Sequence, residues 1–309
     1  MHQTDLHVYR GRFAPSPTGP LHFGSLVTAV GSYLQARSQR GEWLVRMEDL
    51  DPVREVDGAA DAILRTLEAF HLHWDGPVLY QSRRFEAYDA ALARLAAQQD
   101  SFPCACSRKT IVDHWSQSGS AGKVGNSGPI YPGTCREGLP PGQTARAIRV
   151  RVPDHPVAFT DGLQGPQQIH LGREVGDFVV RRADGLYAYH LAVVVDDAFQ
   201  GITEVVRGTD LLTATPPQLH LQSILGMPHP RYRHLPIATN AQGQKLSKQT
   251  FAAAIDDANP GPSLFKALDF LGHCPAAALE KAPPAQLLAW AIENWDTEKI
   301  PACTAICIE

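Results

Sequence analysis

The sequence predicts an α/β protein built on a Rossmann-type, doubly wound parallel sheet. Segments with strand character, such as residues 6–13 and 43–50, alternate with segments whose apolar residues recur at helical spacing. This alternation is typical of a parallel sheet with helices on both faces. A cysteine-containing stretch interrupts it, and short helices follow residue 255. We expect the first half of the sheet domain, an insertion, the rest of the sheet domain and a small C-terminal helical region at residues 1–100, 101–142, 143–255 and 256–309.

The composition is that of a globular protein without a membrane segment. The chain has 309 residues, of which 44% are apolar and 19% charged, enough for one large domain or two smaller ones. It shows no secretory signal and no apolar run of about eighteen residues, so we expect a cytoplasmic protein. Six cysteines then favour thiols or metal ligands over disulfides. The net charge of −4 gives no overall basic character, so any binding of nucleic acid would require a local patch of basic residues.

A loop rich in proline and glycine joins the first predicted strand to the first predicted helix. It contains Pro15, Thr18 and Gly19, and His22 and Gly24 follow it. Because backbone N–H groups at a helix N-terminus favour anions, a strand, a tight loop and a helix can form a phosphate site. The His22 ring can donate to a phosphate oxygen. From these residues alone, a nucleotide pocket and a plain strand-to-helix turn fit equally well.

A second polar loop lies more than 200 residues later and contains Lys245, Ser247 and Lys248. Two mobile ammonium groups can stabilise the charge that develops on a triphosphate during adenylyl transfer. Alone, such a loop is usually a solvated turn. Together with the first loop, and in this order, it favours nucleotide chemistry.

Charged residues also occur where predicted strands end. Glu48 lies in the charged cluster at the carboxyl end of the strand at residues 43–50, and ligands of open α/β sheets bind at such ends. A strand that simply ends in polar residues at the surface fits as well. Arg207 closes a predicted strand and can bind a carboxylate with two hydrogen bonds, although surface ion pairs are commoner. Tyr189 lies in an apolar run, residues 187–197, that suits a buried strand or helix and leaves the tyrosine as a pocket candidate.

The insertion at residues 101–142 lacks helical periodicity and needs something to hold it. Its three cysteines are Cys104, Cys106 and Cys135. Zinc prefers four ligands with thiolate or imidazole donors, so we predict a zinc site here, with three ordinary buried thiols as the alternative. Tyr131, Asp113 and His114 are candidates for the fourth ligand. Tyrosine is uncommon in this role because its hydroxyl has a pKa of about 10.

The two loops together resemble the signature motifs of class I aminoacyl-tRNA synthetases, HIGH and KMSKS. They read His22-Phe23-Gly24-Ser25 and Lys245-Leu246-Ser247-Lys248-Gln249, with different last letters. The resemblance implies formation of an aminoacyl adenylate, with His22, Lys245 and Lys248 as catalytic residues. It implies ATP contacts at Pro15, Thr18, Gly19, His22, Gly24, Ser25, Lys245, Ser247 and Lys248.

Further segments resemble the glutamyl and glutaminyl branch of that class over about residues 6–255. These segments are 12–19, 46–49, 189–192 and 206–208. The resemblance implies a glutamate pocket made by Arg12, Ala14, Ser16, Glu48, Tyr189 and Arg207. The two arginines can pair with carboxylates, and Glu48 can hold the α-ammonium group.

The insertion and the expected lack of an anticodon-binding domain resemble the glutamyl-Q tRNA(Asp) synthetase family. That resemblance implies one zinc ion per chain held by Cys104, Cys106, Tyr131 and Cys135. It implies that L-glutamate is activated with ATP, accompanied by Mg²⁺, without a need for tRNA. Glutamate would then pass to queuosine in the anticodon loop of tRNA(Asp). We expect a monomer with no membrane partner.

Two alternative functions remain open from the sequence. The first is a short glutamyl-tRNA synthetase that charges the 3′ end of tRNA. The second is a non-catalytic, zinc-containing RNA-binding paralogue on the same fold.

Overall fold

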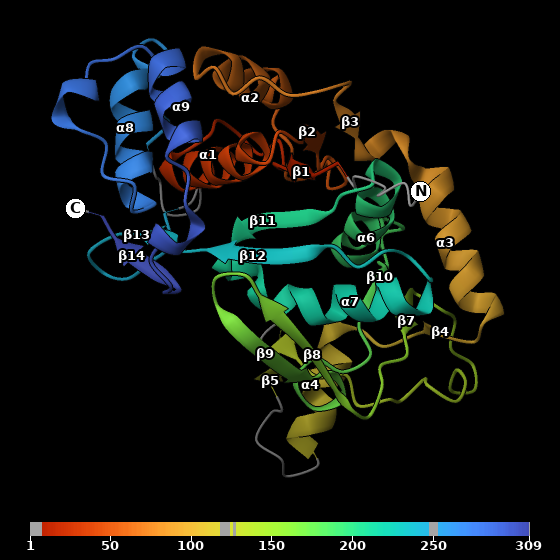
Figure 1. Cartoon of the computed structure of the whole chain (residues 1–309). Coiled ribbons are helices and arrows are strands. Elements are labelled where there is room, and N and C mark those ends of the chain that lie inside the picture. The colour runs from red at the N-terminus through yellow and green to blue at the C-terminus, as the bar shows by residue number, and fades with distance from the viewer. Residues whose placement is uncertain (1–7, 118–123, 126–127, 247–252, 309) are drawn as a thin grey trace, which may run out of the picture.

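The centre of the protein is a parallel sheet whose strands come from both halves of the chain (Figure 1). The computed structural model describes residues 8–117, 124–125, 128–246 and 253–308. Strands β1 (Arg10–Phe13), β2 (Glu42–Met47) and β3 (Leu79–Tyr80) pair in parallel, as do β11 (Glu204–Gly208) and β12 (Arg231–Leu235). The Thr203 N–H donates to the Arg10 carbonyl oxygen over 2.9 Å, so β11 lies beside β1. This order confirms the predicted α/β fold with a parallel sheet.

Alternation along the strands determines which helix covers which face. Phe13 and Trp43 point to α1 (Phe23–Ser38), where the Trp43 Nε1–H donates to Ser32 Oγ over 3.0 Å. Arg12 lies one position from Phe13 and Arg46 lies three positions from Trp43, so both point to the opposite face, where they reach α6 (Tyr189–Gln200). The apolar run at residues 187–197 is therefore mainly helical. Helices on both faces make the sheet doubly wound.

The helices expected near the C-terminus pack directly on α1. Helices α2 (Ala59–Ala69), α8 (Pro260–Phe270) and α9 (Pro284–Glu293) share one hydrophobic core with it. Strand β13 (Ile237–Thr239) pairs in parallel with β14 (Ala305–Cys307), a strand that the sequence analysis does not predict. Short 3₁₀ helices η4 (Ala277–Leu279) and η5 (Thr297–Lys299) connect these elements. The C-terminal region thus completes the core of the first half of the chain.

A second core lies on the other face, where α3 (Phe85–Ala97) and α7 (Thr215–Ile224) pack with α6. The 3₁₀ helices η1 (Gln81–Arg83) and η2 (Thr209–Ala214) precede α3 and α7. A small antiparallel sheet joins this core in the order β10 (Val179–Arg181), β7 (Ala147–Val150), β4 (Ser101–Cys104). Strand β4 is the first element of the insertion at residues 101–142.

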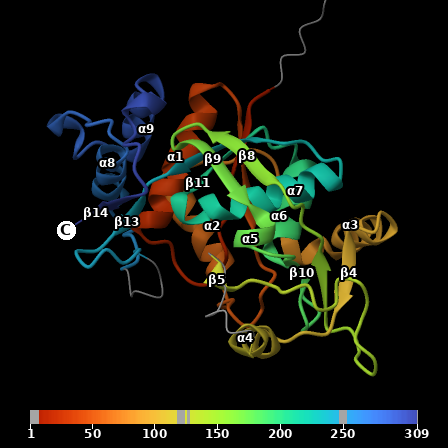
Figure 2. The same cartoon turned by 90° about the horizontal axis from the view of Figure 1, so that it is seen from below.

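The insertion contains one helix that the sequence analysis does not predict, α4 (Arg108–Gln117). Ile111 is its one buried residue, so α4 has no apolar stripe that could reveal it. Figures 1 and 2 both show α4 far from α8 and α9. Short strands β5 (Val124–Gly125) and β6 (Gly128–Pro129) follow it.

Two further details differ from the expectations. The sequence also predicts a helix capped by Asp57, because aspartate is a common N-cap residue. That cap is wrong: helix α2 begins after Gly58, which has a φ of +73°, and no side chain caps it. A hairpin of β8 (Pro156–Asp161) and β9 (Gly165–His170), followed by α5 (Leu171–Glu174), is also unpredicted. Among the described residues, no helix combines the length and the apolar character needed to cross a membrane.

Candidate active site

A cavity of about 840 Å³ opens where β1, β2 and β11 end and α1 begins. It brings together predicted residues from widely separated segments. Those lining it are Arg12, Ala14, Pro15, Ser16, Thr18, His22, Gly24, Ser25, Glu48, Tyr189, Arg207 and Lys245. Gly19 lies in the same loop with a φ of +134°, a conformation suited to glycine. Ser247 and Lys248 lie outside the described residues.

His22 is the N-cap residue of α1. Its Nδ1 accepts the Ser25 N–H over 3.3 Å, and its Nε2 lies 3.1 Å from Ser25 Oγ. A Cβ added to Gly24 would lie 3.3 Å from both the His22 ring and the Leu246 carbonyl oxygen. The two signature segments therefore meet at the start of α1. Positive partial charge at this helix end favours a phosphate there.

Lys245 is held at the rim of the same cavity. Its Nζ forms an ion pair with Asp210 Oδ2 at 2.5 Å, and Asp210 belongs to η2, directly after β11. The end of β11 and the second signature loop are therefore linked by a charge pair. A phosphate bound in the cavity would share it with the Lys245 ammonium group.

Arg12 is buried, and its charge is balanced by Asp197 of α6. The Arg12 Nε donates to Asp197 Oδ1 over 3.1 Å, and Arg46 Nη1 donates to the same oxygen over 2.7 Å. Burial alone would raise the pKa of Asp197, but the two guanidinium groups outweigh it and hold that pKa below its usual value. Asp197 therefore stays ionised and fixes both arginines.

Glu48 and Asp210 are the acidic residues among those that line the cavity, and Glu48 lies on the side of Arg46. Arg46 Nη2 lies 3.4 Å from Glu48 Oε1, and only 12% of the Glu48 side chain is exposed. Burial raises the pKa of Glu48, while the charges of Arg46 and Arg12 oppose that rise. A ligand ammonium group would add a further positive partner and favour the ionised carboxylate.

Arg207 differs from Arg12 because neutral groups hold it. Its Nε donates to His234 Nε2 over 3.0 Å and its Nη2 to Thr215 Oγ1 over 2.8 Å. Its Nη1 donates to the Tyr189 hydroxyl over 3.3 Å, and its Nη2 also reaches the Leu211 carbonyl oxygen. Among the residues that the structure describes, Arg207 forms no ion pair with a carboxylate. It is 3% exposed and lines the cavity, so it offers a ligand carboxylate an unbalanced positive charge.

The predicted metal ligands also lie together. The Sγ atoms of Cys104, Cys106 and Cys135 are within 4.8 Å of one another. The Tyr131 hydroxyl lies 3.6 Å from Cys104 Sγ and accepts the Cys135 N–H over 2.7 Å. Neither Asp113 nor His114, both on α4, contributes a ligand atom to this cluster.

The donor set of this cluster fits zinc, which prefers sulfur and nitrogen donors in a tetrahedral arrangement. A nearby cation supports the fit. Arg149 Nε donates to Cys104 Sγ over 3.3 Å, and its guanidinium lies 4.1 Å from the centre of the Tyr131 ring. This charge would stabilise thiolates, the form in which cysteine binds a metal. The cluster could therefore hold a metal ion.

Comparison with known proteins agrees with this geometry. Residues 8–271 match the model of a family described as "tRNA synthetases class I (E and Q), catalytic domain". The chain is a class I tRNA synthetase. It is 57% identical over 300 residues to a glutamyl-Q tRNA(Asp) synthetase of Dechloromonas aromatica, covering 97% of this chain and 98% of the relative. It is 56% identical over 291 residues to one of Thiobacillus denitrificans, covering 94% of each.

These relatives place the synthetase in the glutamyl-Q tRNA(Asp) synthetase family, whose members are ligases of the class I type. A solved glutamate-tRNA synthetase from Elizabethkingia anophelis has the same fold. It aligns with a TM-score of 0.79 at 24% identity, covering 98% of this chain and 68% of that one.

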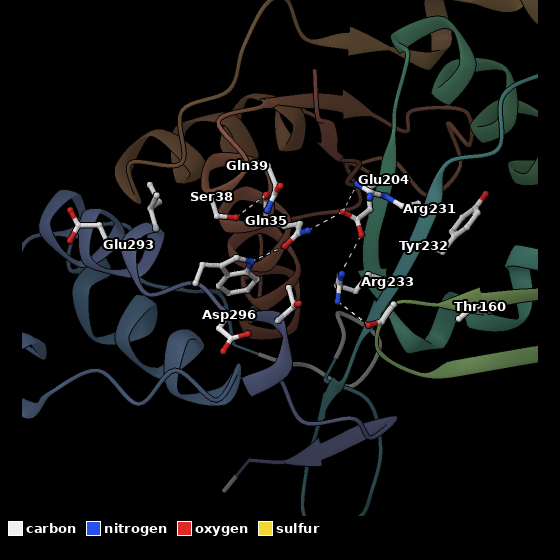
Figure 3. Close-up of a pocket in the computed structure, with 14 residues that line it drawn as sticks. Gln35, Ser38, Gln39, Thr160, Glu204, Arg231, Tyr232, Arg233, Glu293 and Asp296 are labelled. Carbon is white, nitrogen blue, oxygen red and sulfur yellow. Dashed lines mark hydrogen bonds and ion pairs between the residues drawn. The ribbon is translucent and has the colours of Figure 1, made fainter. Parts of the chain in front are cut away.

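A second hollow of the synthetase, of about 610 Å³, lies at the opposite edge of the sheet, where β11 and β12 begin (Figure 3). Glu204 accepts a hydrogen bond from Gln35 there over 3.0 Å and lies 3.5 Å from Arg233 and 3.8 Å from Arg231. No residue of the signature motifs lines it. Because both of its arginines lie within 3.8 Å of Glu204, the described residues of the hollow include no cation without a carboxylate partner, such as Arg207 in the first cavity.

Sequence reasoning missed Asp197 and Asp210, the partners of Arg12 and Lys245. It also missed His234 and Asp161, which lie behind the cavity. Both are buried, and His234 Nδ1 lies 2.6 Å from Asp161 Oδ2. They belong to no motif, and 73 positions separate them. The one sequence signal is a histidine in the segment that leads into the second signature loop, which is weak evidence for any function.

Proposed function

We propose that this synthetase activates L-glutamate with ATP in the absence of tRNA and transfers it to queuosine at the wobble position of tRNA(Asp). The observation that carries the choice of substrate is the unbalanced charge of Arg207 beside the ionisable Glu48. A free amino acid with a second carboxylate matches this pair, because it presents both an ammonium group and an extra anion. The names of the relatives support the acceptor.

The first half-reaction forms glutamyl-adenylate. In our proposal Arg207 binds a glutamate carboxylate, Glu48 holds the ammonium group, and Arg12, Ala14, Ser16 and Tyr189 complete the pocket. An oxygen of the α-carboxylate attacks the α-phosphorus of ATP, a new C–O–P linkage forms, and pyrophosphate leaves. This chemistry needs positioning and charge stabilisation and no side-chain nucleophile.

The start of α1 and the second signature loop would hold the triphosphate. His22 lies at the N-terminus of α1, whose N–H groups favour anions. Lys245 and Lys248 would stabilise the charge that develops on pyrophosphate. Mg²⁺ would accompany the ATP phosphates, as is common at sites of this chemistry.

The second half-reaction transfers the glutamyl group. A hydroxyl of queuosine would attack the activated carbonyl, an ester would form, and AMP would leave. One zinc ion held by Cys104, Cys106, Tyr131 and Cys135 would stabilise the insertion without entering either step. We place the reaction in the cytoplasm, where ATP and tRNA are both available, and expect the chain to act as a monomer.

Glutamate-dependent exchange between ATP and labelled pyrophosphate, measured without tRNA, tests the first half-reaction. We expect Arg207→Gln to raise the KM for glutamate about a hundredfold, because a buried charge pair would lose one partner. The KM for ATP should change little. Lys248→Ala should instead lower kcat by orders of magnitude if that lysine stabilises the transition state.

Arg231→Gln is the matched control, because Arg231 is an exposed arginine of the second hollow. It should leave both KM values unchanged. Exchange that depends on another amino acid, or a normal KM for glutamate in Arg207→Gln, would contradict the proposed substrate. Absence of exchange in the unaltered protein would favour a non-catalytic RNA-binding role.

A further inference from the structure

Arg207, His234 and Asp161 form a buried chain of hydrogen bonds behind the cavity. Arg207 and His234 are direct neighbours in the parallel pairing of β11 with β12. The Arg207 Nε lies 3.0 Å from His234 Nε2, and His234 Nδ1 lies 2.6 Å from Asp161 Oδ2 at the end of β8. His234 is fully buried, and the other two are at most 3% exposed. The unpredicted β8–β9 hairpin thus reaches the proposed substrate pocket through two side chains.

The hydrogen-bond roles in this chain are fixed by arginine, which can only donate. His234 Nε2 must therefore accept from Arg207, so the imidazole is neutral and carries its proton on Nδ1. That proton is donated to Asp161. The other oxygen of Asp161 accepts the backbone N–H groups of Leu163, Gln164 and His234 over 2.9–3.1 Å. The turn of the hairpin therefore holds the carboxylate that selects the tautomer of His234.

Charged and titratable groups around His234 agree with a neutral ring. Burial lowers the pKa of His234, and Arg207 lowers it further, against the opposing charges of Asp161 and Asp210. The Tyr232 ring stacks beside it with centroids 6.2 Å apart. Burial raises the pKa of Asp161, but hydrogen bonds from His234 and the backbone outweigh this and lower it. The ground state is a neutral imidazole next to an ionised carboxylate.

A neutral acceptor has a specific consequence for Arg207. A carboxylate in direct contact would orient the guanidinium but also neutralise it, as Asp197 does for Arg12. An imidazolium would repel it. Neutral His234 orients the guanidinium while leaving its charge for a ligand. Of the two Nη1–H groups, one donates to Tyr189, and the other has no partner among the described residues.

We propose that Asp161 and His234 are positioning residues that hold Arg207 oriented and without a counter-ion, and that they thereby set the preference for glutamate over glutamine. This inference rests on the proposed function, because it takes the Arg207 ligand to be the substrate carboxylate. An uncharged amide in the same place forms no ion pair with a buried guanidinium. A correctly held Arg207 therefore discriminates between the two side chains, and a displaced Arg207 loses part of that discrimination.

The test measures exchange with glutamate and with glutamine for His234→Leu and His234→Gln. Because a lost hydrogen bond to a charged group commonly corresponds to a tenfold to hundredfold change, His234→Leu should raise the KM for glutamate at least tenfold. The KM for ATP should stay within about twofold of the original value, and selectivity for glutamate over glutamine should fall. His234→Gln, whose amide oxygen can still accept from Arg207, should keep most of the original KM for glutamate and most of the selectivity for glutamate over glutamine.

The pH profile gives a readout that loss of packing alone would not move. In the unaltered protein the KM for glutamate should rise only at a pH below the ordinary histidine pKa of about 6.5, because the pKa of His234 is lowered and a protonated His234 no longer accepts from Arg207. This rise should vanish in His234→Gln. Asp161→Asn should move it to lower pH, since the carboxylate that favours the imidazolium is gone.

His220→Leu is the matched control. His220 is a half-buried histidine of α7 that bonds the Arg151 carbonyl oxygen, away from the cavity. It should leave both KM values and the selectivity unchanged. Normal glutamate kinetics in a folded His234→Leu protein, or an equal rise in the KM for ATP, would overturn this inference and leave the proposed function standing. Absence of glutamate-dependent exchange in the unaltered protein would overturn the proposed function and this inference with it.

Discussion

Nε of Arg12, at the end of β1, donates to Oδ1 of Asp197 on α6 over 3.1 Å, although 185 positions separate the two residues. Arg46 of β2 donates to the same oxygen. One buried carboxylate therefore joins two strands of the first half of the chain to a helix of the second. The guanidinium group of Arg12 is paired with a carboxylate of the protein itself, whereas that of Arg207 has only neutral partners among the described residues and can pair with a ligand carboxylate.

Removing this anion should destabilise the protein strongly. We expect Asp197→Asn to lower the free energy of unfolding by about 3–5 kcal/mol, because two buried guanidinium groups would lose their common partner. Urea titration would measure this. Asp184→Asn is the control, since its ion pair with Arg182 is exposed and worth at most about 1 kcal/mol. Equal effects of the two substitutions would contradict the account.

The ion pair of Asp197 with Arg12 also predicts how the stability of the protein changes with pH. The folded-state pKa of Asp197 is lowered, so its stabilisation is complete above the unfolded value of about 3.9 and is lost as the pH falls through the folded value. The stability difference between the original protein and Asp197→Asn should therefore shrink in acid. Urea midpoints from pH 7 down to pH 3 would show it.

Gly208, at the end of β11, lies close to Asp210, which forms the ion pair with Lys245. A Cβ added there would clash with the Asp210 carboxylate and lie 3.2 Å from Ile237 Cγ2. Gly208→Ala should displace Asp210, and with it Lys245, lowering kcat for pyrophosphate exchange about tenfold to a hundredfold. Gly172→Ala is the control because its added Cβ would make only ordinary contacts. Unchanged exchange in Gly208→Ala would show that this contact does not position Lys245.

The thiol cluster predicts the metal content. The purified protein should hold about one zinc per chain, as expected for a four-ligand site. Cys106→Ser should lose most of it and unfold at lower temperature, because binding energy at such a site is folding energy. Cys274→Ser, which alters an exposed cysteine outside the cluster, should keep its zinc. Full zinc in Cys106→Ser would remove that residue from the ligand set.

His190 should make the protein less stable in acid. Burial, and secondarily the charge of Arg207, lower its pKa to about 4. Because the unfolded chain binds the proton more readily, stability should fall as the pH drops from about 6.5 to 4. The side chain keeps some solvent contact, so we expect a loss of about 2 kcal/mol. Denaturation of His190→Gln over this range should lack that loss; an identical slope in both proteins would contradict it.

Features encoded in short segments could be predicted from the sequence. The loop before α1 carries its own conformational constraints in proline and glycine, and His22 at the start of the helix follows from the local pattern. Arg207 and Glu48 could be proposed because the carboxyl ends of parallel strands meet at one edge. The cysteines could be grouped because few residue types bind zinc.

Features that depend on distant partners could not be predicted. Asp161 becomes part of the site only because β12 brings His234 beside it, and no local pattern encodes that meeting. The packing of α8 and α9 on α1 likewise arises from contacts between the two ends of the chain. The start of α2 at Gly58 depends on a left-handed glycine, which competes with the side-chain cap that Asp57 offers.

The most direct test of the central claim is transfer of labelled glutamate, with ATP, to two tRNA pools that differ only in queuosine. We expect label only in the queuosine-containing pool, and after nuclease digestion we expect it on the anticodon nucleoside. Label on the 3′-terminal adenosine of both pools would contradict the proposal and identify a short glutamyl-tRNA synthetase.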